Sequence, residues 1–285
     1  MAPGYEIPFA ENETMSLARR RTLDGARIAV TGASGGIGLA LAEEFARRGA
    51  KLVLNARRAE VLTSLCTRLG GGGSQAVSVV GDIAEEPTRR KLLDMAGERF
   101  GGLDILVNNA GVGAFGRFAE ADPANLRRIL EVDFFATVEL TRAALPLLQA
   151  SAKSGGRLPA VVNIGSILGH RGIPYAAEYC AAKFAVRGFT ESIRPELAKL
   201  GIDVLLVSPG TTDTGFFDNV LAMQVKLPWR KKEGGGTKPE VVARATADAL
   251  EHGKREIIPS FGGAAMVRLN RWCPAIIDWY LSRYG

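Results

Sequence analysis

Short runs of β-branched and aliphatic residues alternate with longer helical patterns along most of this 285-residue chain. Several runs are apolar throughout, which is typical of strands covered on both faces in a parallel sheet. Parallel strands need crossover connections, usually helices. The alternation therefore predicts an α/β fold: a doubly wound parallel sheet of about seven strands, with a ligand at the carboxyl ends of the strands. The expected strands are Arg27–Thr31, Lys51–Asn55, Ala76–Val80, Ile105–Val107, Ala160–Ile164, Asp203–Val207 and Glu256–Ile258, and the expected helices are Gly36–Arg48, Arg58–Leu69, Pro87–Phe100, Pro123–Leu148, Tyr179–Leu200 and Pro239–His252.

One large domain is the simplest organisation for a chain of this size. With 47% hydrophobic residues it can bury a full core, and its glycine-rich stretches are too short to be linkers. We expect an N-terminal extension at residues 1–24, a single folded domain at 25–260 and an amphipathic helical extension at 261–285. The three cysteines are far apart, which predicts no metal site and a reduced, cytoplasmic protein. The basic residues behind the net charge of +6 are not interleaved with aromatics, so no nucleic-acid partner is expected.

A glycine-rich turn follows the first expected strand. The sequence Thr31-Gly32-Ala33-Ser34-Gly35-Gly36-Ile37-Gly38 leads into a helix, whose free N–H groups and dipole favour an anion. Glycine also lets the backbone approach a pyrophosphate closely. The spacing differs from the G-x-G-x-x-G pattern. Its position in the first βα turn of a repeated βαβ pattern nevertheless predicts a dinucleotide site.

The end of the second strand bears on which dinucleotide binds. An NAD site is expected to carry an acidic residue about 20 residues beyond the glycines, to bind the ribose hydroxyls. Here the sequence reads Leu54-Asn55-Ala56-Arg57-Arg58. Ala56 leaves room, and Arg57 and Arg58 can pair with a 2′-phosphate, although they are also compatible with the solvated start of a helix. The missing acid and the two bases predict NADP(H).

Tyr179 and Lys183 have the spacing Y-x-x-x-K and lie on one face of an expected helix. A free tyrosine, with a pKa near ~10, is a poor acid or base at neutral pH, and a nearby ammonium group favours its phenolate. Ser166 follows a strand, where its hydroxyl can hydrogen-bond a substrate oxygen. Together these groups can deliver a proton to a carbonyl while a nicotinamide supplies the hydride.

Five motifs occur in a fixed order, each directly after a strand or on the expected helix. They are the glycine turn, Asn108-Asn109-Ala110-Gly111, Ser166, Tyr179 with Lys183, and Pro209-Gly210. In this order the chain resembles the short-chain dehydrogenase/reductase family, in its compact single-domain branch, over roughly residues 23–260. The resemblance implies a Rossmann-like catalytic domain that binds a dinucleotide.

The resemblance also implies a role for each matching position. Tyr179 would be the acid/base, Lys183 would bind the nicotinamide ribose and lower the tyrosine pKa, and Ser166 would orient the substrate. The remaining positions would contact the cofactor: Gly32, Ser34, Gly36, Ile37 and Gly38 at the pyrophosphate, Asp82 at the adenine, Asn108, Ala110 and Gly111 on the ribose side and in the sheet, and Pro209, Gly210 and Thr214 at the nicotinamide end.

One catalytic position departs from the family pattern. Asp133 lies in the long expected helix after the fourth strand, where the family usually has an asparagine that helps to hold a water relay to the lysine. Aspartate has nearly the same shape, but its charged form is only an acceptor. Either the role lies in backbone geometry and survives, or a side-chain donor is needed and the relay is altered. His170 and Cys180 lie nearby, and neither is expected to be catalytic.

The substrate is expected to be a small molecule with a carbonyl or secondary alcohol. The residues that would wall its pocket are 112–118, 167–175 and 213–229, and the last stretch is long enough to be a functional lid. Its apolar residues suit an apolar substrate, or they simply pack the lid onto the sheet. The predicted function is an NADP(H)-dependent carbonyl reductase or alcohol dehydrogenase, with a cofactor-binding sensor or scaffold that has lost catalysis as the alternative.

The extension at 261–285 also leaves more than one role open. Ile276, Ile277, Tyr280, Leu281 and Tyr284 share a helical face, with arginines around it. This face can be a subunit contact, a cover for the pocket or a membrane-surface anchor. Packing on its own domain or on a twin subunit in a homo-oligomer is favoured, and peripheral membrane contact is the minority hypothesis.

Overall fold

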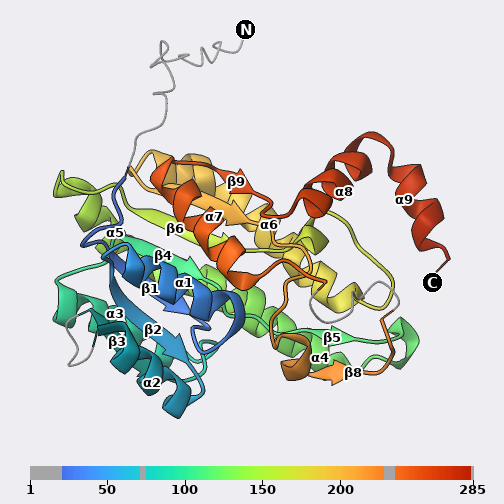
Figure 1. The fold of residues 1–285 in the computed structure, drawn as a ribbon, viewed down its shortest axis with the longest axis horizontal. Helices are drawn as coiled ribbons and strands as arrows, with labels where there is room; N and C mark the ends of the chain where they lie inside the picture. The colour runs from blue at the N-terminus through green and yellow to red at the C-terminus, as the bar shows by residue number, and fades with distance from the viewer. Residues whose placement is uncertain (1–20, 71–74, 228–234, 284–285) are drawn as a thin grey trace, which may run out of the picture.

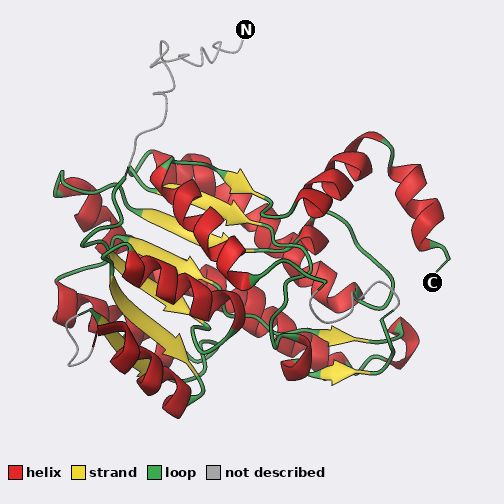
Figure 2. Cartoon of the chain, viewed as in Figure 1, coloured by secondary structure: helices red, strands yellow, loops and turns green. Residues whose placement is uncertain are grey.

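The computed structural model describes residues 21–70, 75–227 and 235–283. In that part of the chain the centre is a seven-stranded, all-parallel sheet in the order β3-β2-β1-β4-β6-β7-β9 (Figures 1 and 2). The predicted doubly wound sheet is confirmed. Its strands are β1 (Arg27–Thr31), β2 (Lys51–Ala56), β3 (Ala76–Val80), β4 (Ile105–Asn108), β6 (Ala160–Ile164), β7 (Asp203–Val207) and β9 (Glu256–Ile257).

Helices cover both faces of this sheet. Side chains of α1 (Gly36–Arg47), α2 (Ala59–Gly70) and α7 (Pro239–Glu251) pack on one face. On the other face lie α3 (Glu86–Phe100), α5 (Ala136–Lys153) and α6 (Ala177–Ala198). Successive side chains of a strand point to opposite faces, so in β1 Val30 belongs to the first core and Ala29 to the second. Both faces are dry, which explains the uninterrupted apolar runs in the sequence.

The long helix expected at Pro123–Leu148 is interrupted in the structure. Asp122 caps α4 (Pro123–Ile129) by accepting a hydrogen bond from the Ala124 N–H at 2.8 Å, and Pro123 occupies the first turn. A π-helical turn, η2 (Leu130–Phe135), then precedes α5. The helical periodicity of the sequence does not reveal this wider turn. Such turns are frequent at functional sites, and this one carries Asp133.

A second, small sheet lies beyond the carboxyl ends of the main strands. β5 (Ala114–Phe115) pairs in parallel with β8 (Ala222–Met223). A 3-10 turn, η4 (Phe217–Asn219), precedes β8, so the described part of the predicted lid is a folded layer. Trp229, the last residue of that lid, lies outside the described residues. The pairing joins residues more than 100 positions apart, which a local pattern cannot indicate.

The predicted N-terminal extension differs from the structure at its inner edge. Arg21 and Leu23, which the sequence placed in the N-terminal extension, are buried, and the Arg21 side chain hydrogen-bonds the Leu250 carbonyl at 2.7 Å and pairs with Asp203. At the other end, the extension forms two helices, α8 (Phe261–Trp272) and α9 (Pro274–Leu281), drawn in red beyond the sheet in Figure 1. The domain therefore begins by Arg21, a few residues earlier than predicted.

Candidate active site

A cavity of about 710 Å³ opens at the carboxyl ends of the main strands. It lies where the strand order reverses between β1 and β4, because crossovers leave that point in opposite directions and their loops separate. Most of the predicted site residues line it. They are Gly32, Ser34, Gly36, Ile37, Gly38, Arg57, Asp82, Ala110, Gly111, Ser166, Tyr179, Lys183, Pro209, Gly210 and Thr214.

Close backbone packing shapes the glycine turn at one end of this cavity. Gly32 has a φ of 68°, and a Cβ there would lie 2.9 Å from the Ala110 Cα. A Cβ at Gly38 would overlap the Gly32 carbonyl oxygen. Both positions therefore need glycine, and the bare backbone they leave at the start of α1 is a cradle that suits a pyrophosphate.

Two residues that sequence reasoning missed hold the glycine turn in place. The Asn109 side chain donates to the Thr31 carbonyl at 2.9 Å, and the Thr31 hydroxyl accepts from the backbone N–H groups of Asn109 and Ala110 at 2.9 and 3.0 Å. These bonds tie the end of β1 to the end of β4 across the strand-order reversal. The pair of asparagines after the fourth strand, Asn108 and Asn109, was the sequence signal that could have indicated this structural role.

Asn108 does not line the cavity, contrary to its predicted place on the ribose side. It is buried and donates hydrogen bonds to the Thr141 hydroxyl at 3.0 Å and the Asn163 side-chain oxygen at 2.8 Å. Neighbouring residues at the end of a strand point in opposite directions, so Asn109 turns towards the glycine loop while Asn108 joins β4 to β6 and α5. Of the two roles predicted for Asn108, the structure shows only the contribution to the sheet.

Basic side chains gather at the other side of the glycine turn. Arg57 is exposed and lines the cavity. Arg58 donates to the Ser34 carbonyl at 2.7 Å, so it braces the turn. Asp82 pairs with Arg128, another lining residue that the sequence did not single out. Burial alone would raise the pKa of Asp82, but hydrogen bonds from the Ala84 N–H and Arg128 outweigh it and hold that pKa below its ordinary value.

Tyr179 and Lys183 line the cavity, and Asp133, which does not line it, is buried against Lys183. Tyr179 and Lys183 lie one turn apart on α6, and the Lys183 Nζ is 5.5 Å from the centre of the tyrosine ring. The same Nζ is 3.0 Å from the Asp133 carboxylate and donates to the Ile164 carbonyl at 3.3 Å. The other Asp133 oxygen accepts from the Val112 N–H at 2.7 Å. The π-helical turn thus directs a carboxylate onto the lysine.

This ion pair changes the expected electrostatics of Tyr179. Burial raises the pKa of the Tyr179 phenol and the Lys183 ammonium lowers it, while the Asp133 carboxylate raises it again, so the net pKa lies above its ordinary value. The predicted lowering by lysine is present but does not prevail. Burial would lower the pKa of Lys183, but the charges of Asp133 and Tyr179 outweigh it, so the lysine stays protonated.

Ser166 lies between the end of β6 and Tyr179. Its backbone is extended, and its hydroxyl accepts from the Leu168 N–H at 3.1 Å. The hydroxyl also hydrogen-bonds the Tyr179 phenol, which favours the phenolate. Two hydroxyl groups therefore converge on one point of the cavity, where a carbonyl oxygen can be held and protonated.

His170 and Cys180 lie close to these residues but do not line the cavity, in keeping with the absence of a predicted catalytic role. His170 is buried with its Nε2 atom 3.0 Å from the Ser208 hydroxyl, and burial lowers its pKa to about 4. Cys180 is buried in an apolar cluster, which raises the pKa of its thiol. Neither side chain is therefore a group of the cavity that could exchange protons there.

The end of the cavity beyond Tyr179 is aromatic. Ring centres of Phe115 and Phe216 each lie 5.7 Å from that of Tyr179, and Phe217 packs 5.4 Å from Phe115. Both phenylalanines of the predicted lid, Phe216 and Phe217, line the cavity and also pack against the apolar cluster around Phe115. The wall is completed by Met266 of α8 and by Ile277, Tyr280 and Leu281 of α9. The C-terminal extension is thus a cover for the pocket.

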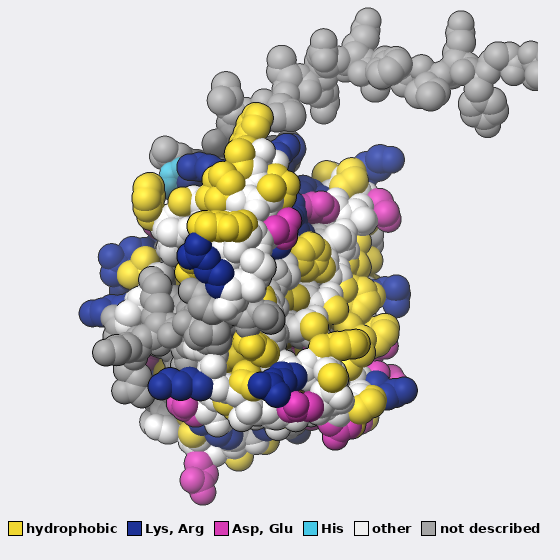
Figure 3. Space-filling view, turned by 90° about the vertical axis from the view of Figure 1, so that its right-hand side faces the viewer, with side chains coloured by type: hydrophobic (Ala, Val, Ile, Leu, Met, Phe, Trp, Pro, Cys, Tyr) yellow, Lys and Arg dark blue, Asp and Glu magenta, His cyan; other side chains and the backbone are white. Residues whose placement is uncertain are grey.

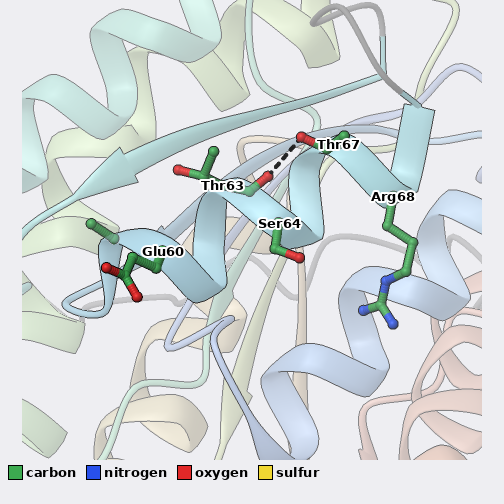
Figure 4. Close-up of a pocket in the computed structure, with 6 residues that line it drawn as sticks. Glu60, Thr63, Ser64, Thr67 and Arg68 are labelled. Atoms are coloured by element: carbon green, nitrogen blue, oxygen red, sulfur yellow. Dashed lines mark hydrogen bonds between the residues drawn. The ribbon is translucent and has the colours of Figure 1, made fainter.

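A second hollow lies on the outer surface of α2 (Figure 4). Its walls come from that one helix, and its Arg68 is held by Glu43 at 2.7 Å. None of the predicted site residues belongs to it, so it is not the candidate site. In the described part of the chain, no cluster of three potential metal ligands occurs, and no helix is long and apolar enough to cross a membrane.

Comparisons with known proteins agree with this geometry. Residues 26–225 match the family model described as short chain dehydrogenase. The chain is 35% identical over 258 residues to the uncharacterized oxidoreductase YxnA of Bacillus subtilis, covering 90% of this chain and 71% of that protein. A short-chain dehydrogenase/reductase from Burkholderia phymatum in complex with NAD superposes with a TM-score of 0.79 at 25% identity, over 90% of this chain and 96% of that one. An alcohol dehydrogenase from Thermococcus sibiricus complexed with 5-hydroxy-NADP gives a TM-score of 0.70 at 26% identity, over 81% and 94%.

Proposed function

This chain belongs to the short-chain dehydrogenase/reductase family, and we propose that it is an NADP(H)-dependent oxidoreductase. Two of the similar solved structures are complexes with NAD and with 5-hydroxy-NADP. The proposed enzyme transfers a hydride between the nicotinamide and a carbonyl or secondary alcohol of an apolar small molecule. The observation that carries the proposal is a single cavity with Arg57 and the glycine cradle at one end and Tyr179 at the other. The aromatic wall beyond Tyr179 supports an apolar substrate, because burying such a group is favourable.

The residues present fit the cofactor, since the glycines of the turn line the cavity at the start of α1, where backbone N–H groups can bind a pyrophosphate. The bound nicotinamide supplies or accepts the hydride. The Tyr179 hydroxyl donates its proton to the carbonyl oxygen in reduction and recovers it in oxidation. Ser166 holds the same oxygen, and the Lys183 ammonium stabilises the phenolate form of Tyr179. Asp133 keeps that ammonium charged and in position.

The proposal is tested by offering the purified protein NADPH or NADH with a panel of ketones, aldehydes and quinones. We expect oxidation of NADPH with at least one apolar carbonyl compound. Tight NADPH binding without turnover of any panel member would instead favour the sensor or scaffold alternative. The intact set of Ser166, Tyr179 and Lys183 at one point of the cavity supports catalysis over that alternative.

Arg57→Ala is expected to raise the KM for NADPH by roughly tenfold to a hundredfold, because it removes a charge-assisted contact to the 2′-phosphate. The KM for NADH, which lacks that phosphate, should change little. Initial rates with each cofactor measure this selectivity. Arg58→Ala is the matched control: its side chain braces the Ser34 carbonyl, so the loss should affect both cofactors alike. An equal effect of Arg57→Ala on NADPH and NADH would contradict the assigned role.

Asp133→Asn is expected to move the pH profile of catalysis towards lower pH. The carboxylate raises the pKa of Tyr179, so the neutral amide should lower it. The rising limb of alcohol oxidation, which needs the phenolate, then begins at lower pH, and the falling limb of carbonyl reduction moves the same way. Profiles of kcat measure both limbs. Asp94→Asn, on the exposed face of α3, should leave them in place. A shift to higher pH would show that Asp133 acts mainly by holding Lys183.

A further inference from the structure

The two C-terminal helices each carry an apolar face that points away from the cavity. On α8, Leu269 and Trp272 are exposed, and on α9 the exposed residues include Ile276 and Trp279. Trp272 is 81% exposed and Trp279 is 62% exposed. Indole rings left in water at these levels are unusual in a surface that has no partner.

These residues form stripes rather than scattered positions. On α8, Ala265, Arg268, Leu269 and Trp272 are exposed at the i, i+3, i+4 and i+7 spacing of one helix face. On α9, Ile276, Trp279 and Arg283 are exposed at the i, i+3 and i+7 positions of that spacing across the helix end, and Tyr280, which lines the cavity, is also partly exposed. The opposite faces are used by the fold, since Met266 of α8 and Ile277, Tyr280 and Leu281 of α9 line the cavity. Each helix therefore has one face that the fold uses and another that is left exposed.

The charge on the outer stripes has one sign. Residues 261–283 contain three arginines, Arg268, Arg271 and Arg283, and a single acid, Asp278, which is held by Arg171. The Arg283 guanidinium lies over the Trp279 ring at 3.9 Å. Arginine beside exposed tryptophan and tyrosine matches an interface that is apolar below and negatively charged above, as in an anionic lipid headgroup layer.

The pair of helices is fixed to the body of the protein. The Asn270 side chain donates to the His170 carbonyl at 3.2 Å and accepts from Arg171 at 3.2 Å, while Arg171 also pairs with Asp278. Figure 3 looks onto the side that carries these helices, and hydrophobic side chains gather in the upper part of that face with basic groups among them. The exposed stripes therefore lie on helices that are fixed to the rest of the fold.

We propose that the outer face of α8 and α9, which we call the α8–α9 face, docks onto the surface of an anionic membrane. The exposed tryptophans enter the headgroup region and the arginines meet lipid phosphates or carboxylates. A second copy of this chain fits less well, because a twofold contact between identical patches would bring like charges together. The docking is independent of the proposed function. One consequence does rest on the proposed function: the cavity wall formed by α9 would lie next to the lipid in which an apolar substrate dissolves.

Sedimentation of the purified full chain with vesicles tests the docking without any turnover. We expect binding to vesicles in which about a third of the lipid is phosphatidylserine, weak binding to phosphatidylcholine vesicles, and release in about 1 M salt, where the Debye length is roughly 3 Å. The variants R268A/R271A and W272A/W279A should each weaken binding to anionic vesicles about tenfold or more. Undiminished binding by both variants would overturn the proposal, as would no binding at low salt.

Matched controls separate docking from general surface effects and from folding. Phe118→Ala removes an aromatic ring that is 84% exposed on η1 (Phe118–Glu120), and Arg90→Ala removes an exposed arginine of α3. Neither should change vesicle binding. Size-exclusion chromatography of W272A/W279A reveals the competing occupant: a loss of oligomers with no vesicle binding by the parent protein would assign the α8–α9 face to a second copy. Turnover without vesicle binding would contradict the membrane docking and leave the proposed function standing. Vesicle binding without turnover would contradict the proposed function and leave the docking standing.

Discussion

Replacing Tyr179 with phenylalanine is expected to lower kcat for carbonyl reduction by roughly 10²–10⁴-fold, the usual contribution of a positioned acid. The phenol is the group of the cavity that can both reach the substrate oxygen and exchange a proton there, beside Ser166 and Lys183. The ring itself remains, so its contacts with Phe115 and Phe216 are kept and the cavity should hold its shape. Steady-state rates with a fixed carbonyl substrate, and NADPH binding followed by fluorescence titration, measure the two effects separately.

Tyr175→Phe is the matched control for this loss. Tyr175 packs in the same aromatic cluster but does not line the cavity, so losing its hydroxyl should leave kcat unchanged. NADPH affinity should be similar in both variants. A Tyr179→Phe enzyme that turns over at the parental rate would refute the assigned acid/base and would require another proton donor in the cavity.

Replacing Lys183 with methionine is expected to cost about 3–5 kcal/mol of folding stability in addition to activity. Lys183 and Asp133 are both buried, and their ion pair at 3.0 Å is the contact that compensates the charge of the carboxylate. Without the lysine, Asp133 is left as an unpaired charge in a dry site. Urea unfolding measures the loss, and the double variant Lys183→Met/Asp133→Asn should regain a large part of the stability but none of the activity.

The pH dependence of this loss distinguishes a charge effect from a packing effect. In Lys183→Met, the folded state favours the protonated carboxyl, because burial raises the pKa of Asp133. A raised pKa in the folded state means that protonation stabilises the fold, so the stability deficit should shrink as the pH falls and be greatest at neutral and alkaline pH. A stability deficit that stays constant between about pH 5 and pH 8 would point to lost packing of the lysine side chain instead.

The secondary structure was predictable to the extent that it depends on local pattern. All seven main strands were found from the sequence pattern, and the central ones stood out most clearly because a strand buried on both faces selects apolar residues whichever strands lie beside it. The π-helical turn at Asp133 was not predictable, because the helical pattern of the sequence is nearly the same before and after it. The pairing of β5 with β8 was missed for a different reason: two-residue strands carry almost no pattern.

The candidate site was predictable as a set of residue types and less so as a set of contacts. The order of the motifs led to Tyr179 and Lys183, and the lack of an acid after the second strand led to Arg57. The sequence did not indicate that Asn109 holds the glycine turn or that Arg128 meets Asp82, because each contact joins segments tens of residues apart. It also offered three roles for the C-terminal extension and favoured packing on the domain or on a twin subunit over membrane contact.

The sequence by itself determined the sheet and the glycine turn and pointed to Tyr179 as the proposed proton donor, because each depends on the side chains of one short segment. The tertiary structure alone decided the electrostatics of that donor. Asp133 reaches Lys183 only because the wide turn before α5 places it beside α6, and burial then magnifies the interaction. In the same way, packing alone turned one face of α9 into a wall of the cavity and left the other exposed.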